Sequence, residues 1–170
     1  LPALLERVRS CEICAHHLPL GPRPVLQAAS EARILIAGQA PGRKVHESGI
    51  PFDDVSGDRL RAWLGLPRHL FYNPRVVAIV PMGFCYPGTG RSGDLPPRPE
   101  CAPAWRQPVL ASLDQVKLTL VLGKHAQDYH LGEGARSVTA TVEDWQRRWP
   151  DVVALPHPSP RNNLWLRRNP

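Results

Sequence analysis

The sequence predicts an α/β fold built around a doubly wound, mostly parallel sheet. Short aliphatic runs begin at Ile34 and at Val152, and each ends abruptly in Gly, Pro and polar residues. Buried strands of a parallel sheet show this pattern where they pass into a loop at their carboxyl ends. Strand-like and helix-like segments also alternate three times along the chain, as in doubly wound folds. Because open α/β sheets bind ligands beside the carboxyl ends of their strands, Gln39 and His157 should face a common pocket.

The length and charge of the chain limit the functions to consider. At 170 residues and 18.9 kDa, the chain is predicted to form one domain over residues 1–170. No apolar run approaches the roughly 18 residues of a membrane span and no signal peptide is recognisable, so we expect a cytoplasmic protein without a membrane partner. The 21 Lys and Arg residues outnumber the 15 Asp and Glu residues, which favours a polyanionic partner. The preference for Arg suits phosphate binding, although GC-rich codon usage would give the same bias.

The first half of the chain contains two predicted strands. Its elements, in order, are a helix over 4–9, a loop over 15–30, the strand from Ile34, a polar loop over 43–49, a helix over 57–64 and a strand over 75–81. Ser56 can cap the helix over 57–64. The apolar residues of that helix fall at Leu60, Trp63 and Leu64, at helical spacing.

The second half begins with a long segment rich in turn residues. Residues 82–103 contain many Gly and Pro residues and are bracketed by Cys85 and Cys101. So long an irregular stretch is unusual in a compact domain unless something fixes it. The remaining predicted elements are a helix over 104–113, a strand over 118–122, a short helix after Gly123 and the strand from Val152.

The four cysteines of the chain form a candidate metal site. Cys11 and Cys14 have C-x2-C spacing, and Cys85 and Cys101 are separated by fifteen residues. A cytoplasmic setting argues against disulfides, and a C-x2-C turn suits redox chemistry or metal ligation. Four thiolates could hold zinc or an iron-sulfur cluster, and the spacing does not choose between them. The alternative is four unrelated buried cysteines.

Four features together resemble the uracil-DNA glycosylase superfamily. They are Gly38-Gln-Ala-Pro-Gly42 after a strand, Gly49-Ile-Pro-Phe52, His157-Pro-Ser-Pro-Arg-Asn162, and the order of the cysteines. The sequence is most similar to the iron-sulfur-containing, family 4-like bacterial branch. The resemblance implies a three-layer α/β/α sandwich around a central four-stranded, mostly parallel sheet. It also implies a structural 4Fe-4S cluster on Cys11, Cys14, Cys85 and Cys101.

Removal of a base from DNA requires a group that binds the extruded base and a group that stabilises the leaving anion. The enzyme must flip the nucleotide, stack the base on an aromatic face and bind its edge. Phe52 is the expected stacking platform, as the resemblance implies; the alternative is a plain core Phe. His157 is expected to hydrogen-bond the departing pyrimidine, as the family's late His does, which stabilises charge that develops in the transition state. The alternative for His157 is a structural loop histidine.

The expected water-activating group is less clear, because the sequence departs from the family here. The position of Gln39 carries an acid in the nearest branch, and an amide can orient water but cannot take its proton. Asp53 or Asp54 could supply a carboxylate, or either could only cap a helix or face solvent. The Asn that many family members use to read the uracil edge falls near Pro81, so the specificity for uracil is open.

Several residues are expected to contact DNA. Gly38, Ala40 and Pro41 of the first motif should bind substrate, and Ser159, Arg161 and Asn162 resemble the loop that enters the duplex beside the flipped base. Leu164 or Trp165 could wedge into the base stack, or both could pack inward on a short terminal helix. Arg43, Lys44 and His46 could contact phosphates, or could form a solvated face.

The sequence therefore predicts a monomeric DNA repair enzyme that flips uracil out of DNA and hydrolyses its N-glycosidic bond, leaving an abasic site. Two alternatives remain. One is a glycosylase for another deaminated base, such as hypoxanthine or xanthine, because familiar recognition groups are missing. The other is a non-catalytic or covalently trapping protein that binds uracil-containing DNA on the same fold, because the clear catalytic acid is missing.

Overall fold

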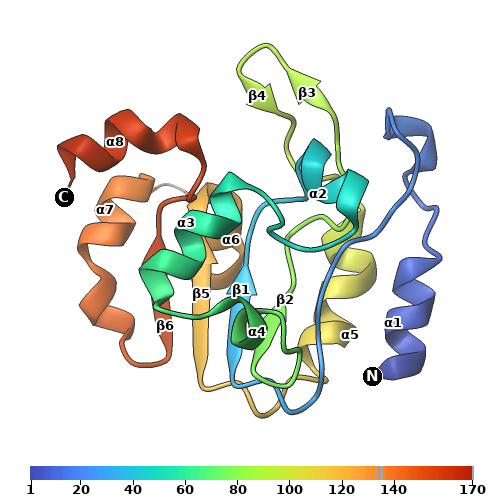
Figure 1. Cartoon of the computed structure of the whole chain (residues 1–170), viewed down its shortest axis with the longest axis horizontal. Coiled ribbons are helices and arrows are strands. Elements are labelled where there is room, and N and C mark those ends of the chain that lie inside the picture. Colours follow the sequence, from blue (N-terminus) through green and yellow to red (C-terminus); the bar gives the residue numbers. More distant parts are fainter. Residues whose placement is uncertain (133, 135, 170) are drawn as a thin grey trace.

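The centre of the protein is a four-stranded sheet in which every strand is parallel to its neighbours (Figure 1). The computed structural model describes residues 1–132, 134 and 136–169. The strands lie in the order β2-β1-β5-β6. Their bounds are Ile34–Ala37 for β1, Val77–Ile79 for β2, Leu118–Leu122 for β5 and Val152–Leu155 for β6. The strand over 75–81 is thus shorter than predicted, and the predicted fold class is confirmed.

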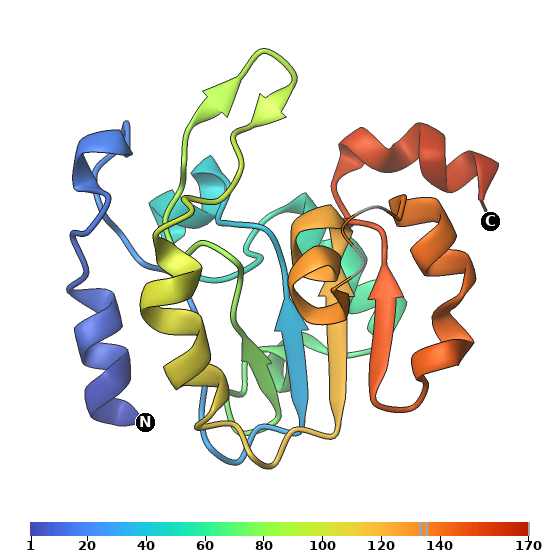
Figure 2. The same ribbon diagram turned by 180° about the vertical axis from the view of Figure 1, so that it is seen from behind.

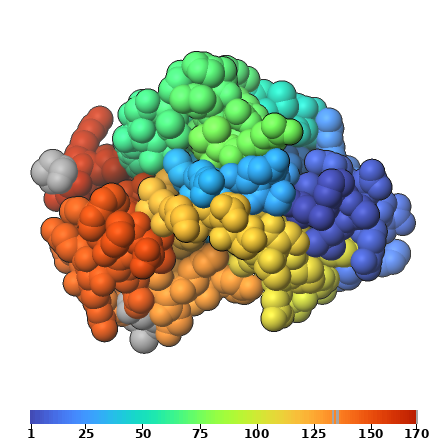
Figure 3. Space-filling view, turned by 90° about the horizontal axis from the view of Figure 1, so that it is seen from below, coloured from blue at the N-terminus to red at the C-terminus, as the bar shows by residue number. Residues whose placement is uncertain are grey.

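Helices cover both faces of this sheet. The front face in Figure 1 carries α3 (Val55–Leu64) and α4 (Arg68–Phe71), and the face seen in Figure 2 carries α5 (Gln107–Leu110) and α6 (Gly123–Leu131). Helix α1 (Pro2–Arg9) packs beside α5. Seen from below, the segments that lead into β1 and β5 lie between the two helical layers (Figure 3).

The alternation of side chains along β1 divides the core between the two layers. Leu35 packs with Val109 and Leu113 on the α5 side, whereas Ile36 packs with Leu60 and Phe71 on the α3 and α4 side. Successive strand residues point to opposite faces, so an all-apolar strand supplies both cores at once. The second predicted apolar position of α3 does not join them, since Trp63 is 40% exposed.

Two local predictions in this region were wrong. The polar stretch over 43–49 forms helix α2 (Arg43–Ser48), which ends at Gly49 with a left-handed φ of 72°. The cap of α3 is Asp54 rather than Ser56, because Asp54 Oδ1 accepts a 2.9 Å hydrogen bond from the N–H of Gly57. Ser56 is instead buried inside the first turn. Both Asp and Ser are suitable N-cap residues. Asp54 takes the cap position because the helix begins two residues earlier than predicted.

The turn-rich segment over 82–103 contains an ordered hairpin. Strands β3 (Thr89–Gly90) and β4 (Gly93–Asp94) pair antiparallel and project from the carboxyl edge of the main sheet (Figure 2). The helix predicted over 104–113 begins as one π-helical turn, Ala102–Arg106, and continues as α5. The segment therefore contains a hairpin in its middle and passes into helical structure at its carboxyl end.

The final part of the chain has more helix than predicted. Helix α7 (Val138–Glu143) was not predicted; it packs beside β6, and a 3-10 turn follows it at Trp145–Arg148. Helix α8 (Asn163–Arg168) places Trp165 against α7, where its Nε1 donates to Thr139 Oγ1 at 2.8 Å. Leu164 on the same helix is 58% exposed. The alternative in which both residues pack inward therefore holds for Trp165 but not for Leu164. Among the described helices, none has the length and apolarity of a membrane span.

Candidate active site

A cavity of about 490 Å³ lies at the carboxyl edge of the sheet. Loops that follow β1, β2 and β6 form its walls, together with Pro51, Phe52, residues 54–56 and the β3-β4 hairpin. Nine of the residues predicted from the sequence line it: Gly38, Gln39, Ala40, Pro41, Phe52, His157, Ser159, Arg161 and Asn162. The two motif loops thus meet in one cavity although more than 100 residues separate them.

Phe52 is held in an unusual backbone conformation at the wall of this cavity. Its φ is 55°, in the left-handed region that a side chain rarely adopts. Its carbonyl accepts a 3.1 Å hydrogen bond from the hydroxyl of Tyr72 and a 3.4 Å bond from Arg61 Nη1. A Cβ at Gly57 would lie 1.7 Å from that same carbonyl oxygen. A glycine at position 57 is therefore required for this conformation.

The ring of Phe52 faces the first motif. A Cβ at Gly38 would lie 3.4 Å from Cζ of Phe52, so the glycine lets the ring approach the loop after β1 closely. The ring also makes an edge contact with buried Phe71, at 6.3 Å between centroids. Because one side packs on the core and the residue lines the cavity, Phe52 can offer an aromatic surface to a planar ligand.

His157 is positioned as a neutral hydrogen-bond donor. The N–H of Ser159 donates to Nδ1 of His157 at 3.3 Å, which leaves the proton of the neutral ring on Nε2. Burial lowers the pKa of His157 below its ordinary value of 6.5, and the charges of Asp54 and Asp94 oppose that shift in part. The ring is therefore neutral at neutral pH and can donate from Nε2.

The loop that carries His157 is fixed by two side chains. Asn162 Nδ2 donates to the carbonyl of His157 at 2.7 Å. Arg59 of α3 donates to the carbonyls of Pro158 and Ser159 at 3.1 and 3.2 Å and to Asn163 Oδ1 at 2.7 Å. Sequence analysis missed Arg59, because nothing in an arginine on a helix indicates contact with a loop about 100 residues away.

The candidate acids take up different positions. Asp53 does not line the cavity; its Oδ1 accepts from Arg68 Nη2 at 2.9 Å, and this contact lowers its pKa. Asp54 lines the cavity but uses Oδ1 to cap α3. Asp94 of the hairpin also lines the cavity, and sequence analysis did not select it. No sequence signal marks Asp94, because it follows no predicted buried strand and belongs to none of the motifs.

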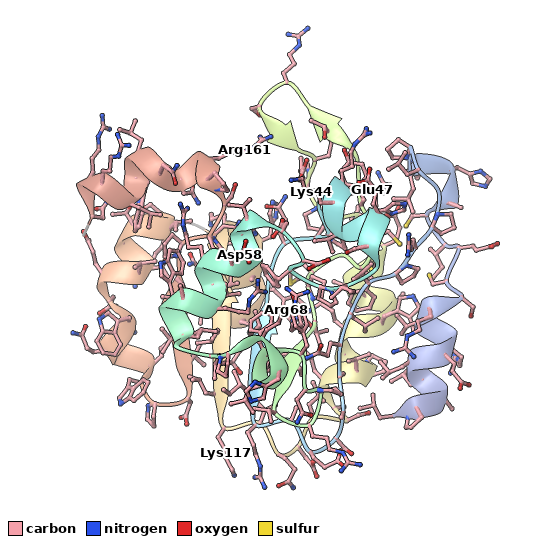
Figure 4. All side chains as sticks on the ribbon, viewed as in Figure 1. Lys44, Glu47, Asp58, Arg68, Lys117 and Arg161 are labelled. Carbon is pink, nitrogen blue, oxygen red and sulfur yellow. The ribbon has the colours of Figure 1, made fainter. Side chains whose placement is uncertain are left out.

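The rim of the cavity carries positive charge. Lys44 and Arg161 lie on its lining and are both exposed; Lys44 comes from α2 and Arg161 from the segment after β6 (Figure 4). Arg43 is exposed beside Lys44 on α2. The prediction that His46 contacts phosphates was wrong, because His46 is buried in α2. Burial, and to a lesser extent the charge of Arg23, lowers the pKa of His46. Because residues 43–48 form helix α2, the side chain of His46 points inward, which was not expected for an irregular stretch.

The four cysteines line a second, much smaller cavity of about 20 Å³. Two N–H groups point at their sulfurs: the N–H of Phe84 lies 3.3 Å from Cys101 Sγ, and Trp105 Nε1 lies 3.1 Å from Cys11 Sγ. Burial raises the pKa of Cys85 to about 11 and that of Cys101 to about 12. Within the part of the chain that is described, no three His, Cys, Asp or Glu side chains converge on one metal-ion position.

Arg106 connects the surroundings of the two cavities. This residue is fully buried, and its Nη1 donates to the carbonyls of Val80 and Pro81, the latter at 2.8 Å. Pro81 lines the large cavity, while Arg106 ends the π-helical turn that follows Cys101. Its Nη2 lies 2.6 Å from His130 Nε2, and burial lowers the pKa of His130 to about 4.

Comparison with known families identifies the larger part of the chain. Residues 26–170 match the sequence model of the Uracil DNA glycosylase superfamily. The matched part contains the whole sheet, every residue that lines the large cavity except Val25, and Cys85 and Cys101. It begins after Cys11 and Cys14, so the match does not distinguish branches by their cysteines.

Proposed function

This chain belongs to the uracil DNA glycosylase superfamily, and we propose that it flips uracil out of DNA and hydrolyses its N-glycosidic bond, leaving an abasic site. The observation that supports the proposal most directly is the joint presence of Phe52 and His157 on the walls of one cavity of about 490 Å³. An aromatic surface and a neutral donor are the two groups that a flipped pyrimidine requires.

The leaving base would be stabilised by His157. Cleavage of the glycosidic bond leaves negative charge on the pyrimidine, and Nε2–H of a neutral His157 would donate to it. Because Nδ1 already accepts the N–H of Ser159, the ring is oriented before substrate binds. A donor aimed in advance at developing charge stabilises the transition state more than the ground state. Gln39 would orient the attacking water from the opposite motif.

DNA would bind across the rim of the cavity. Arg43 and Lys44 are exposed and could neutralise phosphates on one side of the target nucleotide. The loop with Ser159, Arg161 and Asn162 would lie against the duplex on the other side, with the exposed Leu164 just behind it. We propose a monomer that works on DNA in the bacterial cytoplasm, since one chain supplies every group invoked here.

One observation supports a second candidate. Pro81 lines the cavity where many relatives are expected to carry the Asn that reads the uracil edge, and proline has no side-chain donor or acceptor. Base recognition would then rest on backbone groups or on another polar side chain. This favours a wider substrate range that includes hypoxanthine or xanthine.

We further propose that Cys11, Cys14, Cys85 and Cys101 hold a structural 4Fe-4S cluster. The four thiols line one small cavity, and N–H groups of Phe84 and Trp105 are aimed at two of the sulfurs, which is a common surrounding for cluster sulfurs. The cluster would join the amino-terminal segment to the sheet and take no part in the reaction.

Activity on defined oligonucleotides tests the function. The purified protein is incubated with single-stranded and duplex DNA that contains one uracil, hypoxanthine, xanthine or thymine, and abasic sites are then cleaved with alkali. Scission of the uracil strand alone supports uracil excision, and scission of the other deaminated strands supports the second candidate. An intact strand with a band shifted on a denaturing gel would instead indicate covalent trapping.

Chemical analysis of the purified protein tests the cofactor. We expect about four iron and four acid-labile sulfide per chain, with a brown colour. One zinc per chain without sulfide would replace the cluster with a structural zinc ion. If protein purified without oxygen contains neither iron nor zinc, the result would support the alternative that the four cysteines are unrelated.

A further inference from the structure

The β3-β4 hairpin contributes a carboxylate to the cavity. The hairpin rises from the carboxyl edge of the sheet, beside the loop that follows β1 (Figures 1 and 2). Asp94, its last strand residue, lines the cavity together with Ser92 and Gly93. The catalytic groups assigned so far come from the two motif loops. The hairpin is thus a further element at the site, beside the two motif loops and the loop that carries Phe52.

Contacts on both sides hold the hairpin in place over the cavity. On one side, Gln39 Nε2 donates to the carbonyl of Leu95 at 3.2 Å, which ties the base of the hairpin to the first motif. On the other side, Arg161 Nη1 donates to the carbonyl of Ser92. A Cβ at position 93 would lie 1.5 Å from Arg161 Nη1, so a side chain there would displace the guanidinium from this contact. The hairpin is therefore a wall that both motif loops fix.

The carboxylate of Asp94 is oriented by a short hydrogen-bond chain. Its Oδ1 accepts from Thr89 Oγ1 at 3.1 Å, and that hydroxyl lies 2.6 Å from the hydroxyl of buried Tyr86. Its Oδ2 faces Gly42, where a Cβ would lie 3.4 Å away. Asp94 is also close enough to His157 for its charge to act on that ring. One oxygen is fixed by the hairpin while the other lies beside the motif loop.

The site needs a proton acceptor that the motif residues do not provide. The amide of Gln39 cannot take a proton, Asp53 is paired with Arg68 outside the cavity, and Asp54 caps α3. We propose that Asp94 is a catalytic residue that binds the attacking water and accepts its proton. This inference rests on the proposed glycosylase function and names the group that completes it.

The step is balanced as a hydrolysis. The bond between C1′ of the deoxyribose and the base nitrogen breaks, and its electron pair leaves with the base, whose charge His157 stabilises. The water oxygen forms the new bond to C1′ while its proton passes to Oδ2 of Asp94. The base anion then takes up a proton, and Asp94 returns its own to solvent. No oxidant, reductant or further reactant is required.

Rate and binding measurements on matched variants test this role. Asp94→Asn keeps the size of the side chain and an oxygen that can accept from Thr89, so the hairpin should stay paired. Single-turnover excision should fall by roughly 10²- to 10⁴-fold, the usual contribution of a general base. Affinity for an oligonucleotide with non-hydrolysable 2′-fluoro-deoxyuridine should stay within about threefold, because the base and phosphate contacts remain. Asp114→Asn, an exposed residue before β5 at the opposite edge of the sheet, is the matched control.

The possible outcomes separate the inference from the function on which it rests. No excision of any base by the unmodified protein would overturn the proposed function itself. Full activity of Asp94→Asn in an active protein would overturn only the role of Asp94. A large loss in Asp54→Asn with none in Asp94→Asn would assign the proton to Asp54 instead. A rate loss in Asp94→Asn matched by an equal loss of affinity would reduce Asp94 to a binding residue, which also contradicts the inference.

Discussion

The large cavity at the sheet edge and the cysteine cavity differ in volume and in the side chains that line them. The large cavity has a volume of about 490 Å³, and its walls carry polar groups from loops, such as His157 and Asp94. The cysteine cavity has a volume of about 20 Å³, and four thiols line it, of which burial raises the pKa of Cys85 and Cys101. A site that exchanges substrate must remain open, whereas a site that fastens two segments is most stable when filled. The comparison predicts that substitutions in the two cavities affect different measurements.

Among the substitutions that test this comparison, His157→Ala should have the largest effect on the excision rate. Loss of a single preorganised donor to a developing anion costs about 10²- to 10³-fold in rate. We therefore expect single-turnover excision of uracil to fall by that factor, while the affinity for a non-cleavable substrate analogue and the iron content stay unchanged. An excision rate equal to that of the unmodified protein would remove His157 from the mechanism.

Cys85→Ser should have the opposite effects. Without its cysteine the cluster is lost or incompletely held, and because metal binding is coupled to folding, the free energy of unfolding should fall by an amount on the order of several kcal/mol. Iron content and urea denaturation measure this. Excision per folded molecule should fall much less than in His157→Ala. If instead the serine variant stays fully stable but loses excision, the cluster is catalytic and the distinction between the cavities fails.

His130, which contacts buried Arg106, should make the stability of the protein depend on pH. The pKa of His130 is about 4 in the folded protein, below its ordinary value of 6.5, because of burial and the charge of Arg106. As the pH falls, the unfolded chain therefore binds a proton first, and stability is lost between pH 6.5 and pH 4. The loss from this residue amounts to about 3 kcal/mol.

His130→Gln isolates this contribution from other histidines that titrate in the same range. The amide oxygen of glutamine can still accept from Arg106, but the side chain does not titrate. Urea unfolding of both proteins across this pH range should give a smaller pH dependence for the variant. Parallel curves for the two proteins would show that His130 does not contribute.

The smallest effect is expected for Asp53→Asn, which lies next to Phe52 in the sequence but outside the cavity. Its partner Arg68 is more than half exposed, and exposed ion pairs contribute little. Excision should change by less than about threefold. A loss comparable to that of His157→Ala would return Asp53 to the catalytic groups and would show that the cavity rearranges when DNA binds.

The sheet and the two loops that meet at its edge could be predicted from the sequence. Aliphatic runs at β1 and β6 end in Gly and Pro, and that local pattern depends only on neighbouring residues and on the burial of both sheet faces. Because parallel strands end at one edge, the same pattern was enough to bring Gln39 and His157 together. The four cysteines were also selected from the sequence as one site, and they line one cavity, although their spacing predicts this less directly.

Which acids and cations reach the cavity depends on contacts between elements that are far apart in the sequence. Asp53 and Asp54 are adjacent in the chain, but the start of α3 turns one to the cavity and leaves the other with Arg68. Asp94 reaches the site because a hairpin folds back over it, and Arg59 holds the His157 loop from a helix about 100 residues away. Such contacts depend on the packing of whole elements, so no short stretch of sequence specifies them.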